Sequence, residues 1–188
     1  ETALKLIAQA DVVVQNLRPG VVDKLGLGPR TGRERFPRIV YLSISGFGSR
    51  GPSKDRPGSD IGAQAESGLM SVPGDRDRPP QKVGVPIVDA AAASLGAQAV
   101  LAALYGREKT GQGASIETSL LDVAMHLQAA TWADFLGGGP EPTRIGDIST
   151  WTPGNASPTR VTGIYDHLDR DFALPRQERV EWKGTDGA

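Results

Sequence analysis

The residue with the clearest chemical potential in this sequence is Asp89, a single carboxylate between an apolar segment and an alanine-rich one. Residues 83–88 (VGVPIV) predict a short strand, and residues 90–106 predict a helix. An aspartate at such a junction is a favoured helix N-cap, which stabilises a helix by about 1 kcal/mol. A carboxylate at the end of a strand can also attack an activated acyl group. Both roles are compatible, because one oxygen can cap the helix while the other remains free.

Two further patterns suggest chemistry that their surroundings do not support. Residues 46–51 (GFGSRG) match the glycine spacing of dinucleotide-binding loops and follow a predicted strand. A dinucleotide site also needs a helix that opens inside the motif, but Pro52 and Pro57 follow at once, so we predict a turn-rich loop instead. His126 lies between two apolar residues of a predicted helix, which favours a core or interface histidine over a catalytic one.

The elements that must position Asp89 alternate between strands and helices. Runs rich in β-branched residues predict three more strands, at 11–15, 37–45 and 114–119. Longer helices are expected at four places, which are 2–9, 61–70, 90–106 and 120–136. Gly111 stands just past the third of these helices, where a C-cap glycine is favoured. The alternation predicts an α/β fold with a largely parallel sheet.

The composition excludes several classes of function. The 188 residues carry a net charge of −1 and no basic stripe with interleaved aromatics, so we expect no nucleic-acid partner. No apolar run is expected to reach the roughly 20 residues of a membrane span, and no signal peptide opens the chain. The chain has no cysteine and 2 histidines, which argues against disulfides and a metal centre. We therefore expect a cytoplasmic protein without metal or membrane partners.

The two ends of the chain predict a fragment of a longer protein. The sequence begins inside a helical pattern without an initiator methionine, and it ends soon after a hairpin-like stretch. Beyond Glu141 the sequence is rich in proline, glycine and threonine, as in a linker. We therefore expect residues 1–140 to be part of one large domain. Residues 141–188 would be a linker and the incomplete beginning of a smaller domain.

Several blocks of the sequence, in order, resemble one enzyme family, the class III CoA-transferases. The blocks are ADVVVQNLRPGVVDKLGLG, PRIVYLSISGFGSRGP, RPGSDIGAQAESGLMS, VGVPIVD and LAALYGREKTGQGASIETSLLDVA. They cover residues 5–136. The family includes formyl-CoA transferase, carnitine CoA-transferases and α-methylacyl-CoA racemase.

The resemblance implies a fold, a partner and a nucleophile. Members of the family have a large domain with a Rossmann-like sheet and a smaller domain, and two chains interlock as a homodimer. The family's nucleophilic aspartate falls on Asp89. It would attack an acyl-CoA thioester to form an anhydride, take up CoA as an aspartyl thioester, and pass CoA to a small carboxylic acid. Coenzyme A would thus be part of the substrate, with no permanently bound cofactor.

The resemblance also assigns binding residues. The family contacts CoA through the turn after the first strand, which places Asn16, Leu17 and Lys24 in that role, with Arg18 as a further basic candidate. In the racemase branch a histidine of a GHD motif aligns with Ser59. Serine cannot remove a proton beside a thioester unaided, so transfer is favoured over racemisation. Asp60 would orient the site or cap the following helix, and the cap is the preferred reading.

Two alternatives to CoA transfer stay open at this point. One is an α-methylacyl-CoA racemase or epimerase, which would need a base other than Ser59. The other is a CoA-binding or dimerisation fragment without catalysis. The resemblance implies that the family's first strand-helix segment and most of its small domain lie outside this sequence, so the chain alone could be inactive.

Overall fold

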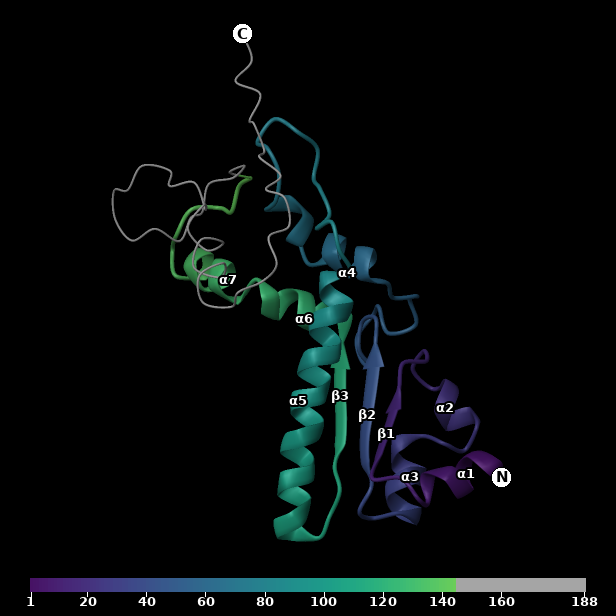
Figure 1. Cartoon of the computed structure of the whole chain (residues 1–188). Helices are drawn as coiled ribbons and strands as arrows, with labels where there is room; N and C mark the ends of the chain where they lie inside the picture. Colours follow the sequence, from purple (N-terminus) through teal and green to yellow (C-terminus); the bar gives the residue numbers. More distant parts are fainter. Residues whose placement is uncertain (145–188) are drawn as a thin grey trace, which may run out of the picture. The chain divides into compact units, whose positions relative to one another are not determined.

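The computed structural model describes residues 1–144 and contains a three-stranded parallel sheet. The strands are β1 (Val12–Gln15), β2 (Val40–Ser45) and β3 (Ser115–Ser119), and they lie in the order β1-β2-β3 (Figure 1). Val12 pairs with Val40, and Tyr41 pairs with Ser115. The predicted α/β fold with a parallel sheet is confirmed. Two predictions lie outside the described residues. They are the hairpin near residues 163–175 and the beginning of a smaller domain.

Helices connect and cover the strands. The α-helices are α1 (Thr2–Ile7), α2 (Val21–Lys24), α3 (Pro29–Arg35), α4 (Asp60–Glu66), α5 (Ile87–Thr110), α6 (Leu120–Leu127) and α7 (Ala129–Leu136). A short 3-10 helix, η1 (Leu69–Ser71), follows α4. Gly111 ends α5 in the left-handed conformation at φ 72°, as the sequence predicted.

Adjacent residues of β2 show which helix covers which face of the sheet. Side chains alternate between the faces of a strand, so Tyr41 and Leu42 point in opposite directions. A Cβ atom at Gly32 of α3 would lie 3.3 Å from the Tyr41 ring, whereas one at Gly96 of α5 would lie 3.0 Å from Leu42 Cδ2. Helices α3 and α5 therefore pack on opposite faces, and the glycine of α5 permits a close approach to β2.

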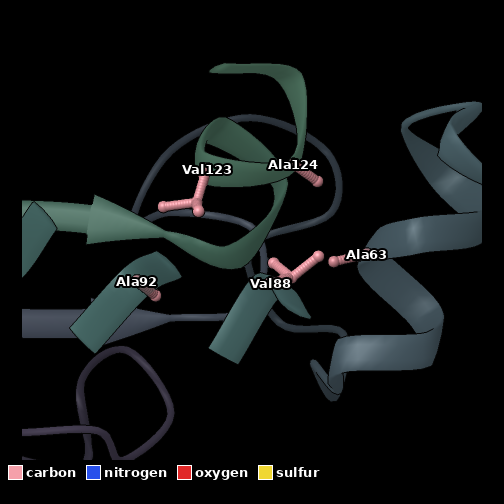
Figure 2. Packing of buried hydrophobic residues seen from close by; sticks show 5 residues of the cluster. All are labelled: Ala63, Val88, Ala92, Val123 and Ala124. Carbon is pink, nitrogen blue, oxygen red and sulfur yellow. The ribbon is translucent and has the colours of Figure 1, made fainter. Parts of the chain in front are cut away.

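A small apolar core joins the helices at the carboxyl end of the sheet. Its buried members come from α4, α5 and α6 (Figure 2) and are Ala63, Val88, Ala92, Val123 and Ala124. Val88 has no exposed surface. Because it is the second residue of α5, this packing anchors the first turn of the helix, next to Asp89.

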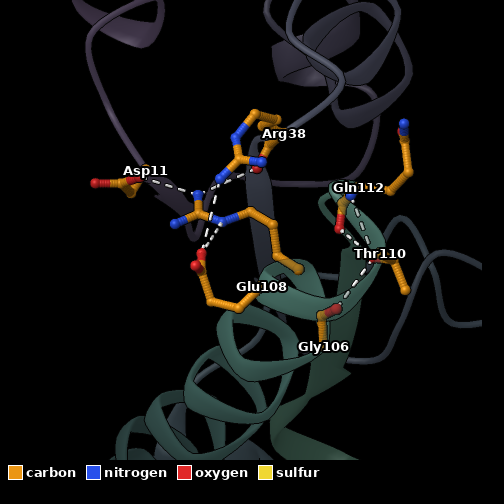
Figure 3. Close-up of polar contacts among 7 residues, drawn as sticks. Asp11, Arg38, Gly106, Glu108, Thr110 and Gln112 are labelled. Carbon is orange, nitrogen blue, oxygen red and sulfur yellow. Dashed lines mark hydrogen bonds and ion pairs between the residues drawn. The ribbon is translucent and has the colours of Figure 1, made fainter.

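The other end of α5 is tied to the beginnings of β1 and β2. Arg107 is buried, and its Nη1 lies 2.9 Å from the Asp11 carboxylate and donates to the Arg38 carbonyl at 3.2 Å. Thr110 adds a local cap, because its hydroxyl donates to the Gly106 carbonyl at 3.0 Å (Figure 3). Anchors at both ends hold α5 in one register against the sheet.

Three predicted elements are wrong in detail. The helix predicted at 61–70 ends at Glu66, and η1 is separate from it. Residues 83–86 form no strand, and α5 already begins at Ile87, with Pro86 at its N-cap. The apolar run is explained by the burial of Val88 in the helical core. The predicted helix 120–136 is two helices, α6 and α7, separated at Gln128. The Gln128 side chain donates to the carbonyls of Ala124 and Ser67, so it bonds backbone groups where the first helix ends.

Helix α5 also corrects an expectation about apolar length. Its 24 residues are long and apolar enough to cross a membrane by length and composition alone, and 17% of the apolar window is buried. Core helices of water-soluble proteins meet the same criterion. One side of α5 packs against β2, β3 and α6. Leu101 and Tyr105 of the same helix are exposed.

Candidate active site

The first turn of α5 is capped from another helix. The Asp60 carboxylate, at the start of α4, accepts the backbone N–H of Val88 at 2.8 Å and that of Asp89 at 3.0 Å through the same oxygen, Oδ2. These are the second and third residues of α5, whose N–H groups an N-cap side chain normally satisfies. Pro86 stands at the N-cap and has no side-chain acceptor. Asp60 therefore supplies the missing acceptor.

Every early N–H group of α5 has a partner. Ile87 donates to the Val85 carbonyl at 2.8 Å, and Ala90 donates to the Pro86 carbonyl at 3.0 Å. Together with the two bonds to Asp60, these contacts satisfy the donors that a helix start leaves open. The prediction that Asp89 caps the helix is wrong, because its side chain makes no cap hydrogen bond and Asp60 has taken that role.

The preferred reading of Asp60 as the cap of the following helix is also wrong. Ser59 is the N-cap of α4, and its hydroxyl oxygen accepts the N–H of Gly62 at 3.1 Å. Asp60 is buried and turns toward α5 instead. Its other oxygen, Oδ1, accepts a hydrogen bond from the side-chain amide of Gln64 one turn later. A negative charge near the start of α5 is favourable, because the N-terminal end of a helix carries partial positive charge.

An open pocket of about 340 Å³ lies between the starts of α4 and α5. It is lined by Ser59, Asp60, Ile61, Lys82, Gly84, Val85, Pro86 and Asp89. The pocket thus brings together three of the residues singled out in the sequence, Ser59, Asp60 and Asp89. Ile61, Val85 and Pro86 give it an apolar rim, and Lys82 is the cation among its lining residues.

The Asp89 carboxylate is free of protein partners within residues 1–144. No hydrogen bond or ion pair to its side chain is present in this part of the chain, and Asp89 is an exposed residue. Surrounding chain nevertheless removes part of the water from the carboxyl group, and this desolvation raises the pKa of Asp89 above its ordinary value. Repulsion from Asp60 raises it further. A carboxylate that is accessible and poorly stabilised is suited to nucleophilic attack.

The residues expected to contact CoA lie outside the pocket, near the end of β1. Asn16, Leu17 and Arg18 are exposed in the turn after β1, and Lys24 is exposed at the end of α2. None of these four residues lines the pocket that contains Asp89. Carboxyl ends of parallel strands share one edge of a sheet, so the turn after β1 lies at the same edge as the loop after β2.

The loop after β2 contains a close backbone contact that positions Ser59 and Asp60. A Cβ atom at Gly46 would lie 2.3 Å from the Gly58 Cα, so both glycines are required for this approach. No helix opens within residues 46–51 or before Asp60, which confirms the predicted turn-rich loop and excludes the helix that a dinucleotide fingerprint requires. His126 is exposed on α6, so it is not a core histidine in this chain.

Two important residues escaped the sequence reasoning. Gln64 has no exposed surface and connects Asp60 with the backbone of Val83. Lys82 stands in the pocket although it belongs to a polar surface loop. One sequence signal could have identified Gln64. It is a polar residue one turn after Asp60, on the apolar helix face that also carries Ala63. No sequence signal distinguished Lys82 from its basic neighbours.

Comparison with known proteins identifies the family. The model of CoA-transferase family III matches residues 1–183. The chain is 38% identical over 151 residues to the succinyl-CoA:mesaconate CoA-transferase of Haloarcula hispanica, covering 78% of this chain and 38% of that protein. It is 37% identical over 145 residues to the acetyl-CoA:oxalate CoA-transferase of Acetobacter aceti, covering 77% of this chain and 37% of that protein.

Solved structures agree with the sequence comparison. The crystal structure of a CaiB/BaiF family protein from Brucella suis matches with a TM-score of 0.74 and 34% identity, covering 80% of this chain and 41% of that one. The chain therefore spans less than half the length of these relatives. With the fold, the pocket and the family match over nearly all of its residues, this chain belongs to CoA-transferase family III.

Proposed function

We propose that the protein transfers coenzyme A from an acyl-CoA to a carboxylic acid, with Asp89 as the covalent nucleophile. One observation carries the assignment of Asp89. Asp60 caps the first turn of α5, so both oxygens of the Asp89 carboxylate are left free at the pocket. The two roles considered for Asp89 are thus divided between two residues, with Asp60 as the helix cap and Asp89 as the proposed nucleophile. The membership in CoA-transferase family III supports the reaction class.

The proposed reaction proceeds in balanced acyl-transfer steps. A carboxylate oxygen of Asp89 attacks the thioester carbonyl of the donor, the C–S bond breaks, and CoA leaves as a thiolate, which gives a mixed anhydride. The thiolate then attacks the aspartyl carbonyl, releases the donor acid and forms an aspartyl-CoA thioester. The acceptor carboxylate repeats these steps in reverse order and regenerates Asp89. Each step is an attack on a positioned carbonyl, which is the advantage of covalent catalysis.

The pocket suggests small carboxylic acids as acyl groups. Its apolar rim of Ile61, Val85 and Pro86 can contact a short carbon chain, and the Lys82 ammonium can pair with a carboxylate. The relatives named above act on succinyl-CoA with mesaconate and on acetyl-CoA with oxalate. Mesaconate and oxalate are dicarboxylates, so a dicarboxylic acceptor is the substrate class that we favour. Asn16, Leu17, Arg18 and Lys24 are proposed to hold the CoA moiety.

The racemase alternative has little support from the pocket. Removal of a proton beside a thioester requires a base. No histidine is among the residues that line the pocket, and the Ser59 hydroxyl oxygen accepts the Gly62 N–H as the cap of α4. We therefore favour transfer over racemisation.

The proposal includes a homodimer and a cytoplasmic location. Exposed apolar side chains on α5, Leu101 at 65% and Tyr105 at 67% exposure, agree with a further protein surface against this helix. The absence of cysteine from the sequence agrees with a reducing compartment.

The experiment that tests the proposal is an exchange assay on the intact protein. A panel of acyl-CoAs is mixed with isotope-labelled free carboxylic acids, and the labelled acyl-CoA is measured by mass spectrometry. We expect label to enter CoA esters with wild type and with Asp134→Asn, an exposed aspartate outside the pocket, and to fall by about a thousandfold or more with Asp89→Asn. Label transfer that survives Asp89→Asn would refute the assignment of the nucleophile.

A second arm of the assay separates transfer from racemisation. A chiral 2-methylacyl-CoA is incubated in heavy water, and its stereochemistry and deuterium content are followed. We expect retention of configuration without deuterium at the α-carbon. Exchange of that hydrogen, without entry of label from the carboxylic acids into CoA esters, would establish the racemase alternative.

A further inference from the structure

Gln64 joins two parts of the pocket that are far apart in the sequence. Its side-chain Nε2 donates to Asp60 Oδ1, and its Oε1 accepts the backbone N–H of Val83 at 2.9 Å. Asp60 in turn accepts the N–H groups of Val88 and Asp89. One continuous chain of hydrogen bonds therefore runs from the loop at Val83, through Gln64 and Asp60, to the first turn of α5.

The loop and the helix turn both contribute to the pocket lining. Lys82, Gly84 and Val85 come from the loop around Val83, and Asp89 comes from the first turn of α5. The residues between them, 84–86, have no regular secondary structure to hold them in place. Hydrogen bonds to Gln64 and Asp60 are the side-chain contacts that restrain this segment at both of its ends.

Burial makes this pair costly to disturb. Gln64 has 0% and Asp60 has 9% of its surface exposed. A buried donor or acceptor that loses its partner destabilises the folded state, and more so when the group is charged. A Gln64 side chain that moved would leave Asp60 Oδ1 and the Val83 N–H without their present partners. The pair is therefore expected to hold one arrangement rather than several.

We propose that Gln64 is a positioning residue for the reaction at Asp89, acting with Asp60 to fix both the Val83 loop and the first turn of α5. The inference rests on the proposed function for its kinetic consequence. Gln64 contacts no substrate in this account. It sets the direction from which Asp89 meets a bound thioester and the position of Lys82, so its replacement should affect both kcat and the KM of the acceptor.

The substitution Gln64→Glu tests this inference, because it makes the chain of hydrogen bonds depend on pH. When the introduced carboxyl is protonated, it can donate to Asp60 and accept from Val83, as the amide does. When it is ionised, it can donate nothing and repels Asp60. Burial and the nearby Asp60 raise the pKa of the introduced group, so ionisation should fall in the working pH range.

The measurement compares kcat of Gln64→Glu with that of wild type between pH 5.5 and pH 9 in the intact protein. We expect the ratio to be near one at the acid end and to fall by about tenfold or more toward the alkaline end. The matched control is Gln9→Glu, which adds the same charge at an exposed position after α1, outside the pocket and α5. Gln64→Leu, which cannot titrate, should be impaired at every pH.

Amide hydrogen exchange provides a readout that does not require catalysis. In Gln64→Glu at alkaline pH, the amides of Val83, Val88 and Asp89 should exchange faster than in Gln9→Glu under the same conditions. A Gln64→Glu protein that follows wild type across the pH range in both kcat and exchange would overturn the inference. If wild type transfers no CoA, the proposed function fails, and the exchange result alone decides whether Gln64 positions this turn.

Discussion

The backbone N–H of Asp89 donates to the carboxylate of Asp60 across 3.0 Å, although the two residues are 29 positions apart in the sequence. Two aspartates thus meet at the start of one helix with different tasks. Asp60 is buried and bound on both oxygens, whereas Asp89 is exposed and its carboxylate has no protein partner within residues 1–144. Because α4 provides the cap, the carboxylate in the first turn of α5 is not needed for capping.

Removal of the Asp60 side chain should destabilise the protein substantially. Asp60→Ala leaves the N–H groups of Val88 and Asp89 and the amide of Gln64 without their acceptors, so we expect a loss of about 2–4 kcal/mol in the free energy of unfolding. The comparison is Ser59→Ala, which removes only the cap of α4 and should cost about 1 kcal/mol. Urea unfolding of both variants measures the difference. Equal losses would show that Asp60 is not the cap of α5.

The stability of the protein should depend on pH through Asp89. Its pKa is raised in the folded state above the ordinary 3.8, so the folded state holds the proton more tightly than the unfolded chain. The resulting stabilisation is present below pH 3.8 and is lost as the pH rises through the folded pKa. Asp89→Asn has no ionisable group at this position, so it does not lose this stability. It should melt at or above the wild-type temperature at pH 7. The difference in melting temperature between the two proteins should vanish at low pH. A lower melting temperature of Asp89→Asn than of wild type at pH 7 would contradict the raised pKa of Asp89.

Two glycines should respond in opposite ways to alanine. Gly46→Ala places a Cβ atom 2.3 Å from the Gly58 Cα, where backbone must move, and we expect a cost of about 3 kcal/mol or more. Gly106 lies within α5 with no atom within 4 Å of a Cβ there, so Gly106→Ala should stabilise by about 0.5–1 kcal/mol. Thermal or denaturant unfolding of the two variants checks both signs. A tolerated Gly46→Ala would disprove the close contact with Gly58.

Loss of the pocket cation should weaken the binding of the acceptor. Lys82→Ala removes the cation among the pocket-lining residues, and we expect KM for a dicarboxylic acceptor to rise by about tenfold with a smaller change in kcat. Arg78→Ala, an exposed basic residue of the same loop that does not line the pocket, should leave KM unchanged. Steady-state kinetics with varied acceptor concentration separate the two. An equal effect of both variants would indicate a general charge effect.

The sequence predicted the parallel sheet because runs of consecutive valines are typical of parallel strands, as in Val12 to Val14. The burial expected of this run is wrong, because β1 lies at the edge of the described sheet and Val14 is exposed. The sequence predicted the wrong element before Asp89, since periodicity cannot distinguish a short apolar strand from the buried start of a helix. Val88 is buried in a helical core, not in a sheet. The break at Gln128 was missed for a related reason, because a side chain that bonds to the distant Ser67 carbonyl leaves no local pattern.

Three of the residues that the sequence singled out, Ser59, Asp60 and Asp89, line one pocket, but their arrangement was not predicted. Asp89 stood out because it interrupts an apolar and alanine-rich region, and the resemblance drew attention to Ser59 and Asp60. Which aspartate caps α5 depends on a contact between α4 and α5 that only the folded chain creates. Gln64 escaped notice because a single buried amide resembles any polar residue of a helix until its two partners are seen.

The most direct test of the central claim is to trap the intermediate on Asp89. The intact protein is incubated with a panel of acyl-CoAs, treated with hydroxylamine, and digested for peptide mass spectrometry. The account predicts a hydroxamate on Asp89, formed from its activated carboxyl, and none on Asp60, whose oxygens are bound to Val88, Asp89 and Gln64. An unmodified Asp89 in protein that turns over the same acyl-CoA would contradict the account.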